Sequence, residues 1–405
     1  MNKEELIIQI STGGYLEHKV TYEEISEALK PLLRRLPVKS VIIGWSLDRE
    51  LYKSVLSLLK DYGVKCFLWL PVFSETGLLA EDVGRLLDSG GKEVKSYSLS
   101  KGENFEFYCP NQKRNIEAFL NIYEENFGDL AFDGVFLDKI RYGTFANGLS
   151  GVFSCFCPEC QERYKMLLIN QEALKAEMEK VRRGEGNYAE RPLGIKSYEC
   201  GCYDFEHPVW ELFFRKKSED ITDALRIITD YFRKRGLFVG MDTFAPFLGY
   251  FAGQNVAHLS SMADFVKPMM YRITDAPAGL PFETDYLLKE TVKGDTAEDE
   301  KAVKAAGNHL FRALGCKEPI QGRFDLDFVK KELSYMAELS APVYCGIEIN
   351  KNHVAPAVPD YILENLRGLK GVPIQGYVLS WDILSAPEEN IRAVTDYFAE
   401  SLAGE

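Results

Sequence analysis

The sequence contains no run of about 18 apolar residues, the length that a membrane-spanning helix needs. Its amino-terminal residues show no basic segment followed by an apolar stretch of signal-peptide length. Basic side chains are in the minority, with 48 Lys and Arg against 61 Asp and Glu and a formal net charge of −13. Binding to a phosphate backbone calls for a basic surface instead. These absences predict a cytoplasmic protein that binds neither membranes nor nucleic acid; they leave its oligomeric state open.

Several catalytic and nucleotide-binding motifs are also absent. The chain has no Gly-x-Ser-x-Gly elbow, no P-loop, no His-Glu-x-x-His and no dinucleotide fingerprint. It has only five histidines, so a histidine-based metal centre would need most of them to converge. We therefore expect no cofactor for catalysis.

Strand-like segments alternate with amphipathic helical patterns along the whole chain. Eight strands are expected, at 6–11, 39–45, 64–70, 132–138, 237–242, 264–271, 342–349 and 374–381. Eight strands, most of them followed by a helical pattern, predict an α/β fold, a (β/α)₈ TIM barrel formed as one domain by residues 1–405. A doubly wound open sheet is the alternative, but no glycine-rich phosphate loop follows the first strand.

Long segments separate some strands from the helices that follow them. Insertions are expected after strand three, at about 72–111, and after strand four, at 143–207, and a third long connection spans 272–293. The loops after barrel strands lie over the mouth of the barrel, where barrel enzymes keep their active sites. We therefore expect both insertions, including the cysteine-containing 143–207, to shape a binding cleft.

The segment from Phe132 to Tyr142 reads as a buried strand that ends in ionisable side chains. Side chains alternate along a strand, so Gly134, Phe136 and Asp138 share one face. If that face lines the barrel, Asp138 stands at its carboxyl-terminal rim. The alternative is that Asp138 caps the next helix or pairs with Arg141.

Carboxylates and aromatic residues end most of the other strands. The candidates are Asp138, Asp242 and Glu348 for catalysis, and Trp45, Trp69, Arg141, Tyr271, Trp381 and His18 for substrate binding. Cleavage of a glycosidic bond uses two carboxyl groups, one to protonate the leaving oxygen and one to attack the anomeric carbon or activate water. Structural alternatives stay open: Asp242 could pair with Arg141 or Lys139, Trp45 and Trp69 could plug the barrel, and His18 could be solvated.

Five of the nine cysteines lie in the second insertion. They are Cys155, Cys157, Cys160, Cys200 and Cys202. Four thiolates at such spacing suit a tetrahedral structural zinc, and any four of these five could supply it. Reduced thiols without a metal and disulfides are the alternatives. The other four cysteines have apolar surroundings and are expected to be small core residues: Cys66, Cys109, Cys316 and Cys345.

Four segments of the chain resemble barrel proteins classed as hypothetical glycosyl hydrolases. Phe132–Tyr142 resembles their fourth strand, Val239–Pro246 their fifth, Asp264–Tyr271 their sixth and Gly376–Asp382 their eighth. The resemblance spans nearly the whole chain, and its motifs are more specific for the fold than for an activity. It implies a glycosidase acting on an oligosaccharide or glycoconjugate.

A template of barrel glycosidases follows from the resemblance. It makes Asp138 the general acid/base and Glu348 the nucleophile, with retention of anomeric configuration preferred. Members of that clan usually carry Asn-Glu where this chain has Leu137-Asp138. The shorter side chain leaves open that Asp242 takes the acid role or that the roles exchange. Two other classes remain: a non-catalytic carbohydrate-binding barrel, and a lyase or isomerase that uses Lys139 or Lys267.

Overall fold

The computed structural model describes residues 4–13, 18–74, 83–98, 104–292 and 297–403. Eight parallel strands close into a barrel in the order β1-β10-β9-β8-β7-β4-β3-β2. These strands are β1 (Glu5–Ser11), β2 (Val38–Gly44), β3 (Lys65–Pro71), β4 (Gly134–Asp138), β7 (Phe238–Phe244), β8 (Phe265–Met269), β9 (Tyr344–Glu348) and β10 (Gly376–Ser380). The predicted TIM barrel is confirmed, and each of the eight expected strands overlaps one of these.

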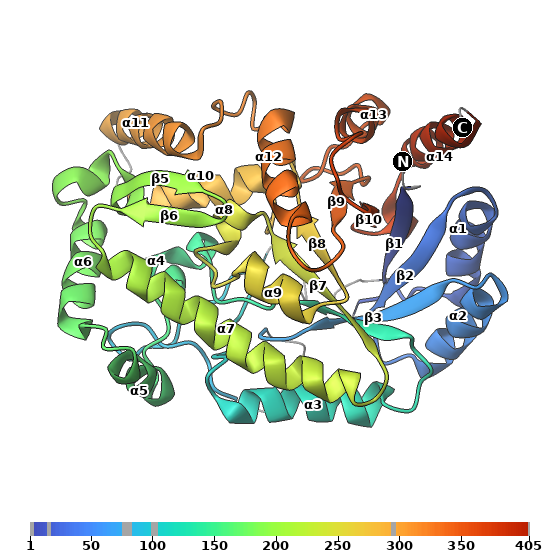
Figure 1. The fold of residues 1–405 in the computed structure, drawn as a ribbon, viewed down its shortest axis with the longest axis horizontal. Coiled ribbons are helices and arrows are strands. Elements are labelled where there is room, and N and C mark those ends of the chain that lie inside the picture. Colours follow the sequence, from blue (N-terminus) through green and yellow to red (C-terminus); the bar gives the residue numbers. More distant parts are fainter. Residues whose placement is uncertain (1–3, 14–17, 75–82, 99–103, 293–296, 404–405) are drawn as a thin grey trace.

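Helices surround the barrel (Figure 1). Between or after the barrel strands run α1 (Tyr22–Arg35), α2 (Arg49–Asp61), α3 (Lys113–Phe127), α7 (Val209–Arg233), α8 (Pro246–Gly249), α9 (Val256–Met262), α10 (Leu280–Thr291), α11 (Ala297–Leu314), α12 (Leu326–Ala337), α13 (Pro359–Gly368) and α14 (Glu388–Ala403). In the part of the chain that the structure describes, none of the helices combines the length and apolar character needed to cross a membrane.

Helix α1 illustrates how the sequence sets these elements. The Thr21 hydroxyl accepts a hydrogen bond from the backbone N–H of Glu24, and the Glu24 carboxylate accepts one from the backbone N–H of Thr21, which forms a capping box at the amino terminus. Ile25, Leu29 and Leu32 recur at helical spacing and are buried. The helix therefore starts at a defined residue and packs one apolar stripe against the barrel.

An aromatic layer fills the interior of the barrel. The Phe265 ring meets Phe67 edge-on at 5.2 Å between centroids and stacks on Phe136 at 5.8 Å. Gly240 leaves room for this layer, because a Cβ atom there would lie 2.3 Å from the Phe265 ring. Since side chains alternate along a strand, Asp138 and Lys267 share the inward face with Phe136 and Phe265, two residues nearer the carboxyl end. Asp138 and Lys267 therefore lie next to the aromatic layer, on its side toward the carboxyl ends of the strands.

The segment between β4 and α7 forms structure of its own. It contains α4 (Gly148–Val152), α5 (Pro158–Met166), α6 (Gln171–Arg183) and an antiparallel hairpin of β5 (Ile195–Glu199) and β6 (Cys202–Phe205). In Figure 1, α5, α6 and the hairpin lie at one end of the molecule, and α1 and α2 lie at the other. The chain that leaves the end of β4 therefore builds one side of the protein.

Candidate active site

Four polar side chains on neighbouring strands form an interior row: Trp69, Asp138, Asp242 and Lys267. Asp242 stands opposite Lys267 in the ladder, and Asp138 follows Leu137, which stands opposite Met241. Trp69 Nε1 donates a hydrogen bond to Asp138 Oδ2 over 3.0 Å, and Lys267 Nζ donates to Asp242 Oδ2 over 2.8 Å. The register of β3, β4, β7 and β8 therefore brings two carboxyl groups together between an indole and an ammonium group.

Asp138 is the more accessible of the two carboxyl groups, being half-buried where Asp242 is buried. Its two oxygens accept hydrogen bonds from the Trp69 indole and from the backbone N–H of Lys139. Two N–H donors stabilise the negative charge of a carboxylate and fix its orientation. The Trp69 indole therefore helps to hold the Asp138 carboxylate, and its side chain is only 7% exposed.

Asp242 has the properties of a proton donor. Burial raises the pKa of Asp242 to about 7; the Lys267 ammonium opposes this shift and the Asp138 charge adds to it. Near neutral pH the carboxyl thus exchanges its proton readily, which suits general acid–base catalysis. Its Oδ1 atom is buried and has no hydrogen-bond partner among the described residues. A buried polar atom of this kind calls for a partner from outside the chain or for a proton.

Lys267 is fully enclosed by the row and the strands around it. Besides Asp242, its ammonium group donates to Gln9 Oε1 over 3.2 Å and lies 5.4 Å from the centroid of the Tyr271 ring. Burial acts to lower the pKa of Lys267, but the Asp242 carboxylate outweighs it and the pKa ends above its ordinary value. Lys267 is therefore a protonated counter-ion, which disfavours the Schiff-base chemistry of a lyase.

Glu348 lies at the end of β9 with its carboxylate already bound. Tyr361 Oη donates to Oε2 over 2.6 Å, and the backbone N–H of Ile273 and the hydroxyl of Thr274 donate to Oε1 over 3.1 and 3.2 Å. Burial raises the pKa of Glu348, and these hydrogen bonds oppose the shift. Among the described residues, no hydrogen bond joins Glu348 to Asp138 or Asp242. Its contacts fit a positioning role that ties the segment after β8 to α13.

Trp381 presents a partly exposed ring at the end of β10. It meets Tyr271 edge-on, with centroids 5.9 Å apart and planes at 78°. Asn350 holds the backbone here: its Oδ1 accepts from the N–H of Trp381 over 2.7 Å, and its Nδ2 donates to the carbonyl of Asp382 over 2.9 Å. Asn350 was not among the predicted site residues, although it shares the strand parity of Glu348. Asn350 thus fixes the backbone at Trp381, whose ring remains partly exposed.

Three predicted binding residues have other surroundings. His18 is exposed and its Nε2 lies 2.7 Å from Glu24 Oε1, at the start of α1. Trp45 lines a small cavity between the end of β3 and helix α3, outside the interior row. Arg141 is buried, donates to the carbonyl of Tyr142 and lies between two phenylalanine rings. None of the three contacts a carboxyl group of the row through a hydrogen bond in the described part of the chain.

The cysteines assemble differently from the prediction. The sulfur atoms of Cys109, Cys155, Cys157 and Cys160 all lie within 4.8 Å of one another, and all four residues are buried. Cys200 and Cys202 are exposed on the β5–β6 hairpin and do not belong to this cluster. The cluster therefore holds Cys109 in place of Cys200 and Cys202, and Cys109 is buried as predicted.

A sequence signal for Cys109 did exist. It lies in the insertion after β3 and precedes Pro110, as Cys157 precedes Pro158 at the start of α5. Cys109 is far along the chain from the C-x-C-x-x-C run, so spacing alone does not group it with that run. Cys109 and Cys157 thus share a feature of the sequence: each lies outside a strand or helix and is followed directly by proline.

Comparison with known proteins finds solved structures of similar fold but no matching protein family. No protein-family model matches the chain, and no curated protein matches it. Among solved structures, the β-galactosidase of the psychrophilic Marinomonas ef1 is similar with a TM-score of 0.55 and 13% identity, over 98% of this chain and 60% of that one. The Group IV chitinase of Ostrinia furnacalis has a TM-score of 0.47 and 9% identity, over 98% and 100%.

The similarity to the Marinomonas structure confirms the predicted likeness to glycosyl hydrolase barrels at the level of the fold. The chain spans 60% of the length of the Marinomonas enzyme. At such low identity, similarity extends to the barrel and leaves the chemistry to be argued from the site itself.

Proposed function

We propose that this protein is a retaining glycoside hydrolase in which Asp138 is the nucleophile and Asp242 the general acid/base. The observation that carries the proposal is the Asp242 carboxyl group, buried with a pKa of about 7 and one oxygen unpartnered among the described residues. It lies beside a second carboxylate in a barrel whose structural neighbours include glycosidases. Two carboxyl groups in different environments are what this reaction needs.

The reaction follows from the two environments. Asp242 gives its proton to the glycosidic oxygen while an Asp138 oxygen attacks the anomeric carbon, so that the C–O bond to the leaving group breaks and a glycosyl ester forms. Asp242, now a carboxylate, takes a proton from water, and the resulting hydroxide displaces Asp138. Lys267 stabilises the charge that Asp242 carries between the two steps, and Trp69 keeps Asp138 aligned.

The strand arrangement supports retention. Neighbouring strands lie about 4.8 Å apart, and the two carboxyl groups project from positions side by side in the ladder. Retaining enzymes hold their carboxyl groups about 5–5.5 Å apart, whereas inverting enzymes leave about 6.5–9.5 Å for a water molecule. A side-by-side pair fits the shorter separation. Trp381 would supply the stacking surface for one sugar unit.

A panel of aryl glycosides, including galactosides and N-acetylglucosaminides, tests the proposal. We expect turnover of at least one substrate, with kcat/KM falling above about pH 7 as Asp242 loses its proton. Asp242→Asn should lower kcat/KM by about 10³-fold and remove that fall at high pH. Asp133→Asn, the same change just before β4 where the side chain accepts a hydrogen bond from Cys66, is the matched control and should keep near-normal activity.

A non-catalytic carbohydrate-binding barrel is the second candidate, favoured by the accessible Trp381. Binding of a glycan in calorimetry, together with no turnover of any panel member, would replace the hydrolase proposal by this one. Equal activity of Asp242→Asn and wild type would contradict the acid/base assignment while leaving a hydrolase possible.

A further inference from the structure

The structure assigns a structural zinc site to the buried cluster of Cys109, Cys155, Cys157 and Cys160. Cys109 comes from the segment before α3, Cys155 and Cys157 from the turn that leads into α5, and Cys160 from the first turn of α5. The Cys109 sulfur lies 3.6 Å from that of Cys157 and 3.5 Å from that of Cys160. We propose that one Zn²⁺ ion is bound between the four sulfurs, independently of the reaction proposed above.

The spacing of the sulfurs fits a single tetrahedral ion. A Zn–S bond of about 2.3 Å makes the edges of a ZnS₄ tetrahedron about 3.8 Å long. The observed contacts of 3.5 and 3.6 Å, within a limit of 4.8 Å for all four atoms, bracket that length. A disulfide would need sulfurs about 2.05 Å apart. An iron–sulfur cube would hold the thiolates farther apart, because inorganic iron and sulfide lie between them.

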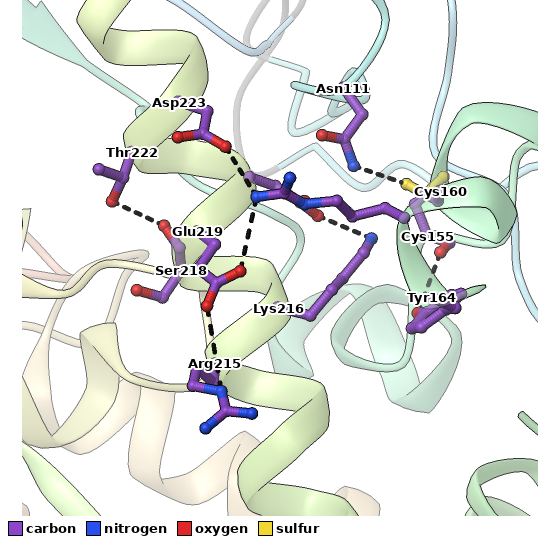
Figure 2. A network of polar contacts seen from close by, with 12 residues as sticks. Asn111, Cys155, Cys160, Tyr164, Arg215, Lys216, Ser218, Glu219, Thr222 and Asp223 are labelled. Carbon is purple, nitrogen blue, oxygen red and sulfur yellow. Dashed lines mark hydrogen bonds and ion pairs between the residues drawn. The ribbon is translucent and has the colours of Figure 1, made fainter. Parts of the chain in front are cut away.

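Hydrogen-bond donors already point at the sulfur atoms. The backbone N–H groups of Leu87 and Cys157 donate to Cys155 Sγ over 3.3 and 3.4 Å, and Asn111 Nδ2 donates to Cys160 Sγ over 3.2 Å. Figure 2 shows the Asn111 amide directed at Cys160. Donors around a metal centre stabilise the charge of its ligands and fix their direction. Neutral thiols packed in an apolar core need no such donors.

A buried ammonium group beside the cluster offsets part of its charge. Four thiolates and one Zn²⁺ ion carry a net charge of −2, which is costly to bury alone. Lys216 of α7 (Figure 2) is fully buried and lies close enough to Cys160 to interact with it electrostatically. It is also paired with Asp220 over 2.7 Å.

The proposed ion would join the two insertions that follow β3 and β4. Cys109 belongs to the first insertion and the other three ligands to the second. Helix α7, which lies beside the cluster, is also tied to the chain that leaves β4, because Tyr142 Oη donates to Asp220 of α7 over 2.7 Å. With four thiolate ligands the ion has no open position for water or substrate, so its role is structural. It would hold in place the segment that follows Asp138.

Metal analysis of the purified full chain tests the site. We expect one zinc per chain by inductively coupled plasma mass spectrometry, and X-ray absorption at the zinc edge should give four sulfur neighbours at about 2.3 Å. Cys109→Ser and Cys160→Ser should lose most of the zinc and unfold at lower temperature. The double variant Cys200→Ser, Cys202→Ser is the matched control and should keep both zinc and melting temperature.

Several results would overturn the proposal. They are a metal-free protein in which all nine thiols react after denaturation, disulfides among the four cysteines by mass spectrometry, or iron in place of zinc. Zinc that survives in Cys109→Ser but is lost from the control would also overturn it. If Cys109→Ser does not fold, the metal content and the X-ray absorption spectrum of the wild-type protein alone decide whether the cluster binds zinc.

Discussion

Asp138→Ala is expected to lower kcat by about 10⁴-fold or more on any aryl glycoside that the wild type cleaves. The change removes the group that forms the covalent intermediate, and such losses are among the largest that single substitutions cause. Steady-state kinetics on the best substrate of the panel measures the effect. Added azide, a small nucleophile that fits the space left by the carboxylate, should restore part of the rate and give a glycosyl azide of inverted configuration.

The azide product separates a chemical role from a structural one. Trp69→Phe removes the hydrogen bond to Asp138 but leaves the nucleophile, so this variant should lose less activity and form no azide adduct. If Asp138→Ala retains more than a tenth of the wild-type rate, or if azide rescues Trp69→Phe equally well, Asp138 is not the nucleophile.

Lys267→Met is expected to destabilise the protein by about 3–5 kcal/mol at pH 8, because it leaves the Asp242 carboxylate buried without its counter-ion. A carboxyl whose pKa is raised in the folded state contributes stability at low pH and loses it as the pH rises through the folded value. For Asp242 that value is about 7, and without the ammonium group it would rise further. The loss should therefore shrink at pH 5, as urea unfolding at both pH values would show.

A double variant supplies the control for this prediction. Lys267→Met combined with Asp242→Asn removes both charges and should recover most of the stability at pH 8, since neither partner is left ionised and unpaired. Equal destabilisation of Lys267→Met at pH 5 and pH 8 would show that packing, and not the ion pair, dominates at this position.

The barrel could be read from the sequence because its strands are apolar runs separated by amphipathic helices. Asp138 stood out for the same reason, as the polar end of a buried run. The pairing of Asp242 with Lys267 could not be read, because it depends on the register between two strands that no sequence pattern reports. Strand parity likewise placed Glu348 with the other carboxyl groups, but at the end of β9 its side chain is bound by Tyr361 and the segment after β8.

The cysteine cluster shows the same limit at longer range. Three of its cysteines lie within six residues and were found from their spacing, whereas Cys109 lies 46 residues before the nearest of them. Cys200 and Cys202 are closer to this run in the sequence than Cys109 is, yet the hairpin that carries them leaves them exposed. Spacing along the sequence identifies the cysteines that lie close together in the chain, and tertiary folding decides which cysteine completes the cluster.

The most direct test of the proposed reaction is to trap its covalent intermediate. The 2-deoxy-2-fluoro glycosyl fluoride of the sugar that the panel identifies should inactivate the enzyme by forming a stable glycosyl ester. Digestion and mass spectrometry then locate the modified residue. The account predicts one sugar on the peptide that contains Asp138. A sugar on Glu348 or another carboxylate, or continued turnover without any adduct, would contradict it.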